Sequence, residues 1–212
     1  MSDIVIIGAG GHARVLVDAL RASGRDVVGY GSKDDESPSG NMKNVPRIGD
    51  DDAVMALGSK NVLLVNGVGT TGNAAPRRGV FEKFRNAGFI FTTVIHPSAI
   101  VAADCVIAEG AQIMAGAILQ PGTRVGINAI INTGARVDHD GNIGDHAHIA
   151  PGACLAGTVT VGAAAHIGAG AVVIQGKSIG EAAIVGAGAV VIFDIPKDVT
   201  VVGVPARHRN AG

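Results

Sequence analysis

From residue 95 onward, every sixth residue of the chain is aliphatic, and the run continues unbroken to residue 191. The residue after the aliphatic one is often glycine, and the fourth residue after it is usually alanine. A period of six fits neither an α-helix nor a simple alternating strand. The aliphatic positions are Ile95, Val101, Ile107, Ile113, Leu119, Val125, Ile131, Val137, Ile143, Ile149, Leu155, Val161, Ile167, Val173, Ile179, Val185 and Val191.

A hexapeptide period predicts a triangular prism in which each side takes one hexapeptide, so that three sides make one 18-residue coil. The aliphatic residue fills the inside of each wall, and the small residue fits near a corner. Because each coil buries its core only by stacking on the next, the repeat predicts a continuous parallel β-helix. Residues one coil apart in the sequence are therefore expected to lie directly above one another.

The first 93 residues have an alternating pattern that predicts a small Rossmann-like βαβ domain. Apolar runs at residues 3–7, 26–30, 62–65 and 89–93 predict strands, and residues 13–23 and 76–88 have helical spacing. Residues 33–44 are polar and rich in serine, glycine and aspartate, so we expect a loop. We divide the chain into an α/β domain at residues 1–93 and a β-helix domain with a C-terminal tail at residues 94–212.

The composition narrows the class of protein. Of the 212 residues, 47% are hydrophobic but only 3% are aromatic, which suits a narrow interior filled by aliphatic side chains. The net charge is −1 without a basic patch, so nucleic-acid binding is not expected. No apolar run reaches the ~18 residues of a membrane span, and no signal peptide is recognised. Two cysteines without metal-type spacing favour a cytoplasmic protein.

His139 is the first candidate for catalysis, because it lies between Asp138 and Asp140. A flanking carboxylate can orient a histidine and raise its basicity, which suits a general base. Gly157 follows one predicted coil later and should stack on His139, leaving open space and a backbone N–H. A base beside such a donor is the minimum set for attack on a thioester carbonyl. The alternative is an exposed histidine without a role.

His148 and His166 are also separated by one predicted coil, which indicates a stack on one edge of the prism. This stack either faces solvent or places His148 near a bound thioester. A zinc centre like that of the β-helical carbonic anhydrases would need two histidines separated by two coils. No pair in this chain has that spacing, so no metal is expected.

The turn Gly8-Ala9-Gly10-Gly11-His12 follows the first predicted strand and opens a helix. Glycines let the backbone approach a phosphate, and a helix N-terminus favours the anion. A dinucleotide site also needs an acidic residue at the end of the second strand, where this chain has Gly31 and Ser32, with Asp34 only later. We therefore expect a nucleotide-diphosphate site, with a plain tight turn as the alternative.

With these motifs, the chain resembles the NeuD/PglD/PerB group of bacterial sugar acyltransferases over nearly its whole length. The motifs that carry the resemblance are Gly8-Ala9-Gly10-Gly11-His12, Val94-Ile95-His96-Pro97-Ser98-Ala99, Ile131-Asn132-Thr133-Gly134-Ala135, Val137-Asp138-His139-Asp140 and Val202-Gly203-Val204-Pro205-Ala206. The resemblance implies a left-handed β-helix, a homotrimer, and acetyl-CoA in the groove between neighbouring helices. It also implies that a nucleotide-linked amino sugar is held by the N-terminal domain.

The resemblance also assigns roles to residues. His139 matches the general base, Asp140 the carboxylate beside it, and Gly157 the glycine whose N–H is suggested to hold the oxyanion. His148 matches a histidine near the acetyl group, and Asn132 a position in the active-site groove. The remaining matches are Ala169 and Ala187 along the pantetheine arm, and Gly8, Gly10, Gly11 and His12 in the diphosphate loop.

The expected activity is therefore acetyl-CoA-dependent N-acetylation of the C4 amine of a dideoxy amino sugar, of the UDP-4-amino-sugar or GDP-perosamine type. O-acetylation of a sialic-acid-like sugar and a non-catalytic nucleotide-sugar scaffold are the alternatives. Ser32 and Asp34 lie where base and ribose should be bound, but many members have a Gly-X-Asp-Asp run there, and this chain has Gly29-Tyr30-Gly31-Ser32-Lys33-Asp34. The choice among UDP, GDP and CMP stays open.

Overall fold

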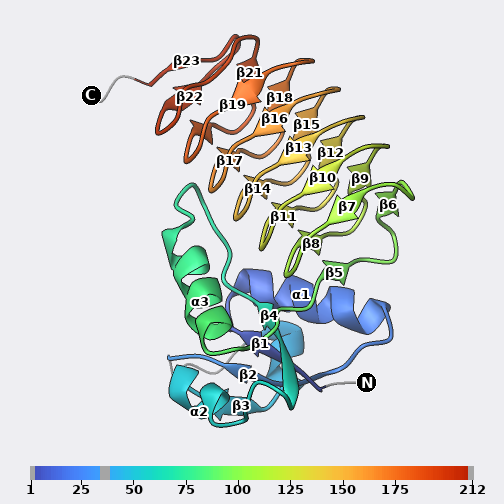
Figure 1. Ribbon diagram of the computed structural model, residues 1–212, viewed down its shortest axis with the longest axis vertical. Helices are drawn as coiled ribbons and strands as arrows, with labels where there is room; N and C mark the ends of the chain where they lie inside the picture. Colours follow the sequence, from blue (N-terminus) through green and yellow to red (C-terminus); the bar gives the residue numbers. More distant parts are fainter. Residues whose placement is uncertain (1–2, 34–38, 210–212) are drawn as a thin grey trace.

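The computed structural model describes residues 3–33 and 39–209. It consists of a small α/β layer at one end and a left-handed, three-sided β-helix that rises from it (Figure 1). The α/β layer has a parallel sheet in the order β3-β2-β1-β4, with β1 at Asp3–Ile7, β2 at Val27–Gly31, β3 at Arg47–Gly49 and β4 at Val62–Asn66. Its helices are α1 at Gly11–Ala22, the 3₁₀ helix η1 at Gly40–Asn44, α2 at Asp51–Met55 and α3 at Ala75–Asn86.

The apolar pattern explains this layer. The β1 residues after Asp3 are buried. Ile4 and Ile6 share a core with the apolar side of α1, which includes Leu16 and Leu20, while Val5 and Ile7 pack in the core on the other face of the sheet. Consecutive parallel strands joined by helices place the turns after β1 and β4 at one edge of the sheet, which is where ligands bind in open α/β folds.

Several expectations for this layer were wrong in detail. The sequence pattern did not reveal the short elements β3 and α2, and part of the expected loop at residues 33–44 is the helix η1. The expected strand at residues 89–93 is reduced to a single bridge between Phe91 and Leu64. Two backbone hydrogen bonds hold this bridge to β4, from the Leu64 N–H to the Ile90 carbonyl and from the Thr92 N–H to the Leu64 carbonyl, both at 2.9 Å. The backbone N–H of Phe91 points to the other side and donates to the Glu109 carboxylate, on the β-helix.

The β-helix has three faces, each a stack of short parallel strands. Face 1 contains β5 (Val94–Ile95), β8 (Gln112–Ile113), β11 (Ile130–Ile131), β14 (His148–Ile149), β17 (His166–Ile167), β20 (Ile184–Val185), β22 (Thr200–Val202) and the antiparallel β23 (Arg207–His208). Face 2 contains β6 (Ile100–Val101), β9 (Ile118–Leu119), β12 (Arg136–Val137), β15 (Cys154–Leu155), β18 (Val172–Val173) and β21 (Val190–Val191). Face 3 contains β7 (Val106–Ile107), β10 (Arg124–Val125), β13 (Asn142–Ile143), β16 (Thr160–Val161) and β19 (Ser178–Ile179).

The pairing confirms the 18-residue coil. Ile131 lies beside Ile149, which lies beside Ile167, and their side chains are fully buried with the alanines of the repeat. The last coil is shorter than 18 residues, as shown by the pairing of Val185 with Val201 rather than with Gly203. Ile95 is an exception to the predicted interior, since 41% of it is exposed; it belongs to β5, the edge strand of its stack, and has no further strand below it.

The corners of the prism turn through left-handed backbone. Every sixth residue from Gly110 to Gly188 has a φ between 53° and 76°. The corner between faces 1 and 2 has glycine at each of these positions, whereas the corner between faces 2 and 3 includes Asp140, and that between faces 3 and 1 includes Asn128. Non-glycine residues rarely adopt this conformation, although Asn and Asp do so more readily than most.

Close stacking of the coils makes glycine necessary at some wall positions. A Cβ on Gly144 would lie 2.6 Å from the backbone nitrogen of Ala163 and 2.8 Å from the carbonyl carbon of Gly162. Both contacts are with backbone of the next coil, which cannot rotate away. The corner glycine Gly188 differs, because a Cβ there would meet no atom within 4 Å.

We therefore expect Gly144→Ala to destabilise the fold far more than Gly188→Ala. The first substitution forces two coils apart and should lower the free energy of unfolding by about 3 kcal/mol or more. The second leaves only the left-handed backbone as a penalty, about 1 kcal/mol. Thermal unfolding of both variants at equal protein concentration measures the difference, and equal melting temperatures would contradict the stacking argument.

Candidate active site

His139 and Asp140 occupy the corner between faces 2 and 3, directly after β12. The His139 backbone N–H donates to the Asp138 carboxylate at 2.7 Å, and Nδ1 of its ring is 2.9 Å from Oδ2 of Asp140. Both side chains are exposed. The hydrogen bond to Asp140 raises the pKa of His139, and the negative charge of Asp138 adds to the effect. With Nδ1 directed to Asp140, Nε2 is the nitrogen that can take up a proton from a substrate.

Two glycines make room for this pair. A Cβ on Gly157, one coil later, would lie 2.6 Å from Cε1 of His139, so the imidazole occupies space that only glycine leaves. The Gly157 amide donates no hydrogen bond within residues 3–33 and 39–209. Gly122, one coil before Asp140, leaves space for the Asp140 side chain in the same way, since a Cβ there would collide with the Asp140 carboxylate. Sequence reasoning missed Gly122, although the same one-coil spacing identifies it.

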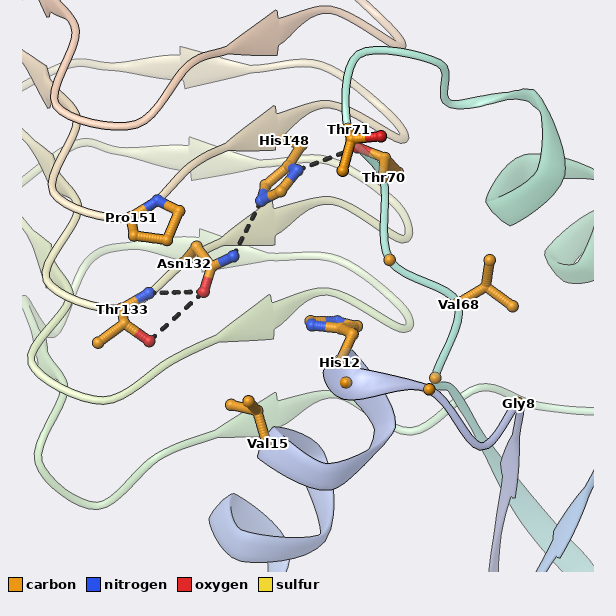
Figure 2. A pocket seen from close by; sticks show the side chains of 14 residues that line it. Gly8, His12, Val15, Val68, Thr70, Thr71, Asn132, Thr133, His148 and Pro151 are labelled. Carbon is orange, nitrogen blue, oxygen red and sulfur yellow. Dashed lines mark hydrogen bonds between the residues drawn. The ribbon is translucent and has the colours of Figure 1, made fainter. Parts of the chain in front are cut away.

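A second group of residues surrounds a cavity of about 650 Å³ between the α/β layer and face 1. The cavity is lined on one side by the glycine turn after β1 and the loop after β4, and on the other by face 1 and its corner with face 2 (Figure 2). Its lining includes Gly8, Gly10, Gly11, His12, Thr70, Asn132 and His148. The structure thus brings the predicted diphosphate turn together with two of the predicted acetyl-site residues.

His148 is buried in the wall of this cavity, on strand β14, so neither the expected prism edge nor the solvent-facing alternative is correct. Its Nδ1 lies 3.0 Å from Oγ1 of Thr70, and its Nε2 lies 3.0 Å from Nδ2 of Asn132 (Figure 2). Asn132 Oδ1 accepts from the backbone N–H of Thr133, so the Asn132 amide donates to Nε2 and His148 carries its proton on Nδ1. Burial, with the neighbouring His166 ring, lowers its pKa to about 3.

His12 links the glycine turn to the β-helix. Its Nε2 is 2.7 Å from Oε1 of Gln112, whose Nε2 donates to the backbone carbonyl of Asn66 at 2.8 Å. The Gln112 amide is thereby oriented, and His12 must donate from Nε2. Burial lowers the pKa of His12 to about 4, assisted by the positive charge of Arg77. His12 is therefore neutral at pH 7 in the protein without ligand.

Ser32 lines a second cavity of about 520 Å³ at the carboxyl ends of β1 and β2. Lys33, Asp51 and Lys83 share this cavity, and Lys83 Nζ lies 2.9 Å from Oδ2 of Asp51. Gly8 borders both cavities, so one extended ligand could cross the glycine turn from one to the other. Asp34 lies outside the described residues.

Ala169 and Ala187 are exposed on the corner between faces 1 and 2. Thr133 and Pro151 line the first cavity, and the two alanines occupy the equivalent positions of the next two coils. Their backbone amides donate no hydrogen bond to any residue that the structure describes. This edge therefore offers a row of backbone donors that continues upward from the cavity.

The two groups do not meet within one chain. The cavity opens at face 1 and its corner with face 2, whereas His139 lies at the other end of face 2, on the corner with face 3. Among the described residues, no three His, Cys, Asp or Glu side chains gather as a metal ion would require. None of the helices that the described residues form is long and apolar enough to span a membrane.

Comparisons with known proteins identify relatives for both parts. Residues 3–84 match the family model of the PglD N-terminal domain. A comparison with curated protein sequences found no match. Among solved structures, a histidine-to-asparagine variant of perosamine N-acetyltransferase from Caulobacter crescentus, in complex with CoA and GDP-perosamine, is 39% identical, with a TM-score of 0.91 over 100% of this chain and 98% of that chain.

The acetyltransferase domain of PglB from Neisseria gonorrhoeae is 34% identical, with a TM-score of 0.91 over 99% of this chain and 100% of that chain. The same domain in complex with acetyl coenzyme A is 35% identical, with a TM-score of 0.88 over 98% of both chains. Similarity at this level runs through the α/β layer and the β-helix alike. The chain belongs to the PglD/PerB family of hexapeptide-repeat sugar acetyltransferases.

Proposed function

We propose that the protein transfers the acetyl group of acetyl-CoA to the C4 amine of a nucleotide-linked dideoxy amino sugar, such as GDP-perosamine or a UDP-4-amino sugar. The observation that carries the proposal is the His139–Asp140 pair, with Nε2 of His139 beside the backbone of Gly157. A base and an N–H donor at one point are what aminolysis of a thioester requires. The relatives crystallised with CoA and GDP-perosamine support the choice of substrates.

The chemistry follows from these groups. Nε2 of His139 accepts a proton from the amine as the amine nitrogen bonds to the thioester carbonyl carbon. The Gly157 amide donates to the oxygen that becomes negative in the tetrahedral intermediate. When the carbon–sulfur bond breaks, the protonated His139 returns its proton to the departing thiolate. Asp140 stabilises the imidazolium between these two steps through its bond to Nδ1.

The two cavities suit the nucleotide part of the substrate. We assign residues 1–93 to nucleotide binding, with the base near Ser32 in the second cavity and the diphosphate at the glycine turn. The sugar then enters the first cavity towards Asn132 and His148. The amides of Ala169 and Ala187 provide donors for the pantetheine arm along the adjoining edge. Residues 94–212 thus supply the acetyl-transfer part of the site.

A homotrimer completes the site in this proposal. Face 1 is covered at its base by the α/β layer, and the outward positions of face 3 are largely polar. Face 2 instead exposes Ile100, Val172, Ile174 and Ile192, with exposed fractions from 38% to 64%. An apolar face of this kind needs a partner. Packing against a second copy would bring the His139 corner of one chain to the cavity of the next.

We also propose the cytoplasm as the location, because both cysteines, Cys105 and Cys154, are free thiols.

The activity test measures thiol release from acetyl-CoA with UDP-, GDP- and dTDP-linked 4-amino sugars and with hydroxy-sugar acceptors. We expect release with at least one 4-amino sugar and little with hydroxyl acceptors. Release with a sialic-acid-like hydroxyl acceptor alone would replace N-acetylation by O-acetylation. Absence of turnover together with no calorimetric binding of acetyl-CoA would instead indicate a scaffold.

Replacement of His139 by alanine should lower kcat by roughly 10²–10⁴-fold, which is the usual contribution of a general base. Because the side chain is exposed, the melting temperature should stay unchanged. His208→Ala, which removes another exposed histidine, is the matched control and should keep full activity. Near-normal turnover by the His139 variant would exclude the proposed role.

Replacement of Asp140 by asparagine should move the pH profile of kcat/KM. The hydrogen bond to Asp140 raises the His139 pKa, and the base works only when deprotonated, so activity should rise with pH through that pKa. In Asp140→Asn the pKa falls, and the acidic limb should shift to lower pH while the plateau decreases because the base is weaker. An unshifted limb would show that another group titrates.

Gly157→Ala should reduce kcat without a comparable loss of stability. The added Cβ would displace the imidazole of His139, with which it would overlap, and a misplacement of ~1 Å can cost about 10²-fold in rate. Kinetics and thermal unfolding of the same sample measure both effects. A fully active Gly157→Ala enzyme would mean that the observed imidazole position is not the reactive one.

A further inference from the structure

Arg77, near the start of α3, carries a positive charge in the interior of the protein. Its side chain is 0% exposed, and it takes part in none of the ion pairs found among the described residues. Burial lowers the Arg77 pKa to about 9, so the guanidinium remains charged at neutral pH. Burying a charge without a counter-ion is costly, and backbone carbonyl oxygens are the acceptors that offset this cost in the part of the chain that the structure describes.

These carbonyls come from both parts of the molecule. Nη1 of Arg77 donates to the carbonyls of Asn66 at 2.9 Å and Val68 at 2.7 Å, at the start of the loop that follows β4. Nε donates to the carbonyl of Asn128 at 3.2 Å, on the corner between faces 3 and 1. The Asn66 side chain adds two further hydrogen bonds: its Nδ2 donates to the carbonyl of Arg77 at 2.9 Å and to Oδ1 of Asn128 at 3.3 Å.

We call this arrangement of Asn66, Arg77 and Asn128 the junction. It joins the end of β4 to the first turn of α3, so that it closes the loop of residues 67–74 at its base and fixes that base to the β-helix. All three residues are at most 1% exposed, so water does not compete for their hydrogen bonds. The Asn66 carbonyl also accepts from Gln112, which binds His12 of the glycine turn.

The far part of the same loop reaches the active-site wall. Thr70 lies 3.0 Å from Nδ1 of His148 (Figure 2). Thr70 accepts the proton of Nδ1, and Asn132 donates to Nε2, so these two contacts select one tautomer of His148 and set the plane of its ring. A shift of the loop by a fraction of an ångström would break the Thr70 contact.

We propose that Arg77 is a positioning residue: through the junction it holds the loop of residues 67–74 against the β-helix, and so keeps Thr70 on His148 in the substrate cavity. The inference rests on the proposed function, in which His148 borders the sugar and the acetyl group. Arg77 itself lies outside the lining of either cavity and acts only through the loop.

The test compares Arg77→Lys with Arg78→Lys. Lysine keeps the buried charge but cannot reach three carbonyls with a planar fork, so kcat should fall about 10- to 100-fold while the KM for acetyl-CoA changes less than about twofold. Arg78 is the next residue on the same helix, but it is exposed and paired with Glu82, so its lysine variant should behave like the wild type. An unchanged kcat in Arg77→Lys would overturn the proposal.

A double-mutant cycle separates positioning from general destabilisation. Thr70→Val removes the hydroxyl that contacts His148 and should reproduce the loss of kcat. If Arg77 acts through Thr70, the kcat of the double variant should be no lower than that of the slower single variant. A kcat reduced by the product of the two single-variant losses would contradict the proposal. Should Arg77→Lys not fold, Asn66→Ala removes the other side chain that closes the loop, and the same non-additivity with Thr70→Val is required.

A measurement without turnover distinguishes this inference from the proposed function. Nitrogen-15 NMR of histidine-labelled protein, with His148→Gln to assign the signal, should show His148 protonated at Nδ1 in the wild type and in Arg78→Lys. Arg77→Lys should give a mixture of tautomers. An unchanged tautomer would refute the positioning role, whereas a changed tautomer in a protein without acetyltransferase activity would refute only the proposed function.

Discussion

The structure depends on one constraint: each coil of the β-helix must lie directly on the next, with an 18-residue register that is kept up to the shorter last coil. The walls contain strands of two or three residues, which could not exist alone, and each is stabilised by the strands stacked next to it. Glycine at positions such as Gly144 allows the backbones to approach, and left-handed residues at the corners from Gly110 to Gly188 turn the chain into the next wall. The register therefore converts distance along the sequence into position in space.

The same register builds the chemical groups. His139 has its neighbour Asp140 within hydrogen-bond distance and Gly157 one coil above, while Gly122 lies one coil below Asp140. None of these positions requires a flexible loop, since every residue of the group is fixed at a corner by the coils around it. Rigid placement of a base beside an N–H donor is what makes such a corner suitable for acyl transfer. Left-handed backbone at Asp140 is the conformational cost of that placement.

The cavity does not depend on the periodic stacking of coils. It lies where the α/β layer meets the β-helix, and buried polar contacts hold these two parts together. His12, Gln112, Asn66, Arg77 and Asn128 form a continuous hydrogen-bonded network between the α/β layer and the β-helix. Apolar contact also joins the two parts, as Val94 and Met114 of the β-helix share a core with α1 and β1. Apolar packing tolerates small displacements, whereas hydrogen bonds define direction and distance. The network therefore fixes the direction and distance of the polar contacts between the cavity walls.

The sequence by itself determined what is periodic or local: the β-helix, its coil length, the stacking of Gly157 on His139 and of His166 on His148, and the glycine turn after β1. These features are local, or repeat at a constant interval, so a pattern in one dimension contains them. The sequence did not indicate that His148 is buried and neutral, that Arg77 and Asn128 meet, or that Thr70 reaches His148. Those contacts join residues far apart in the chain, across the boundary between two folding units. No period relates the two units, so only the way they pack in three dimensions could decide these contacts.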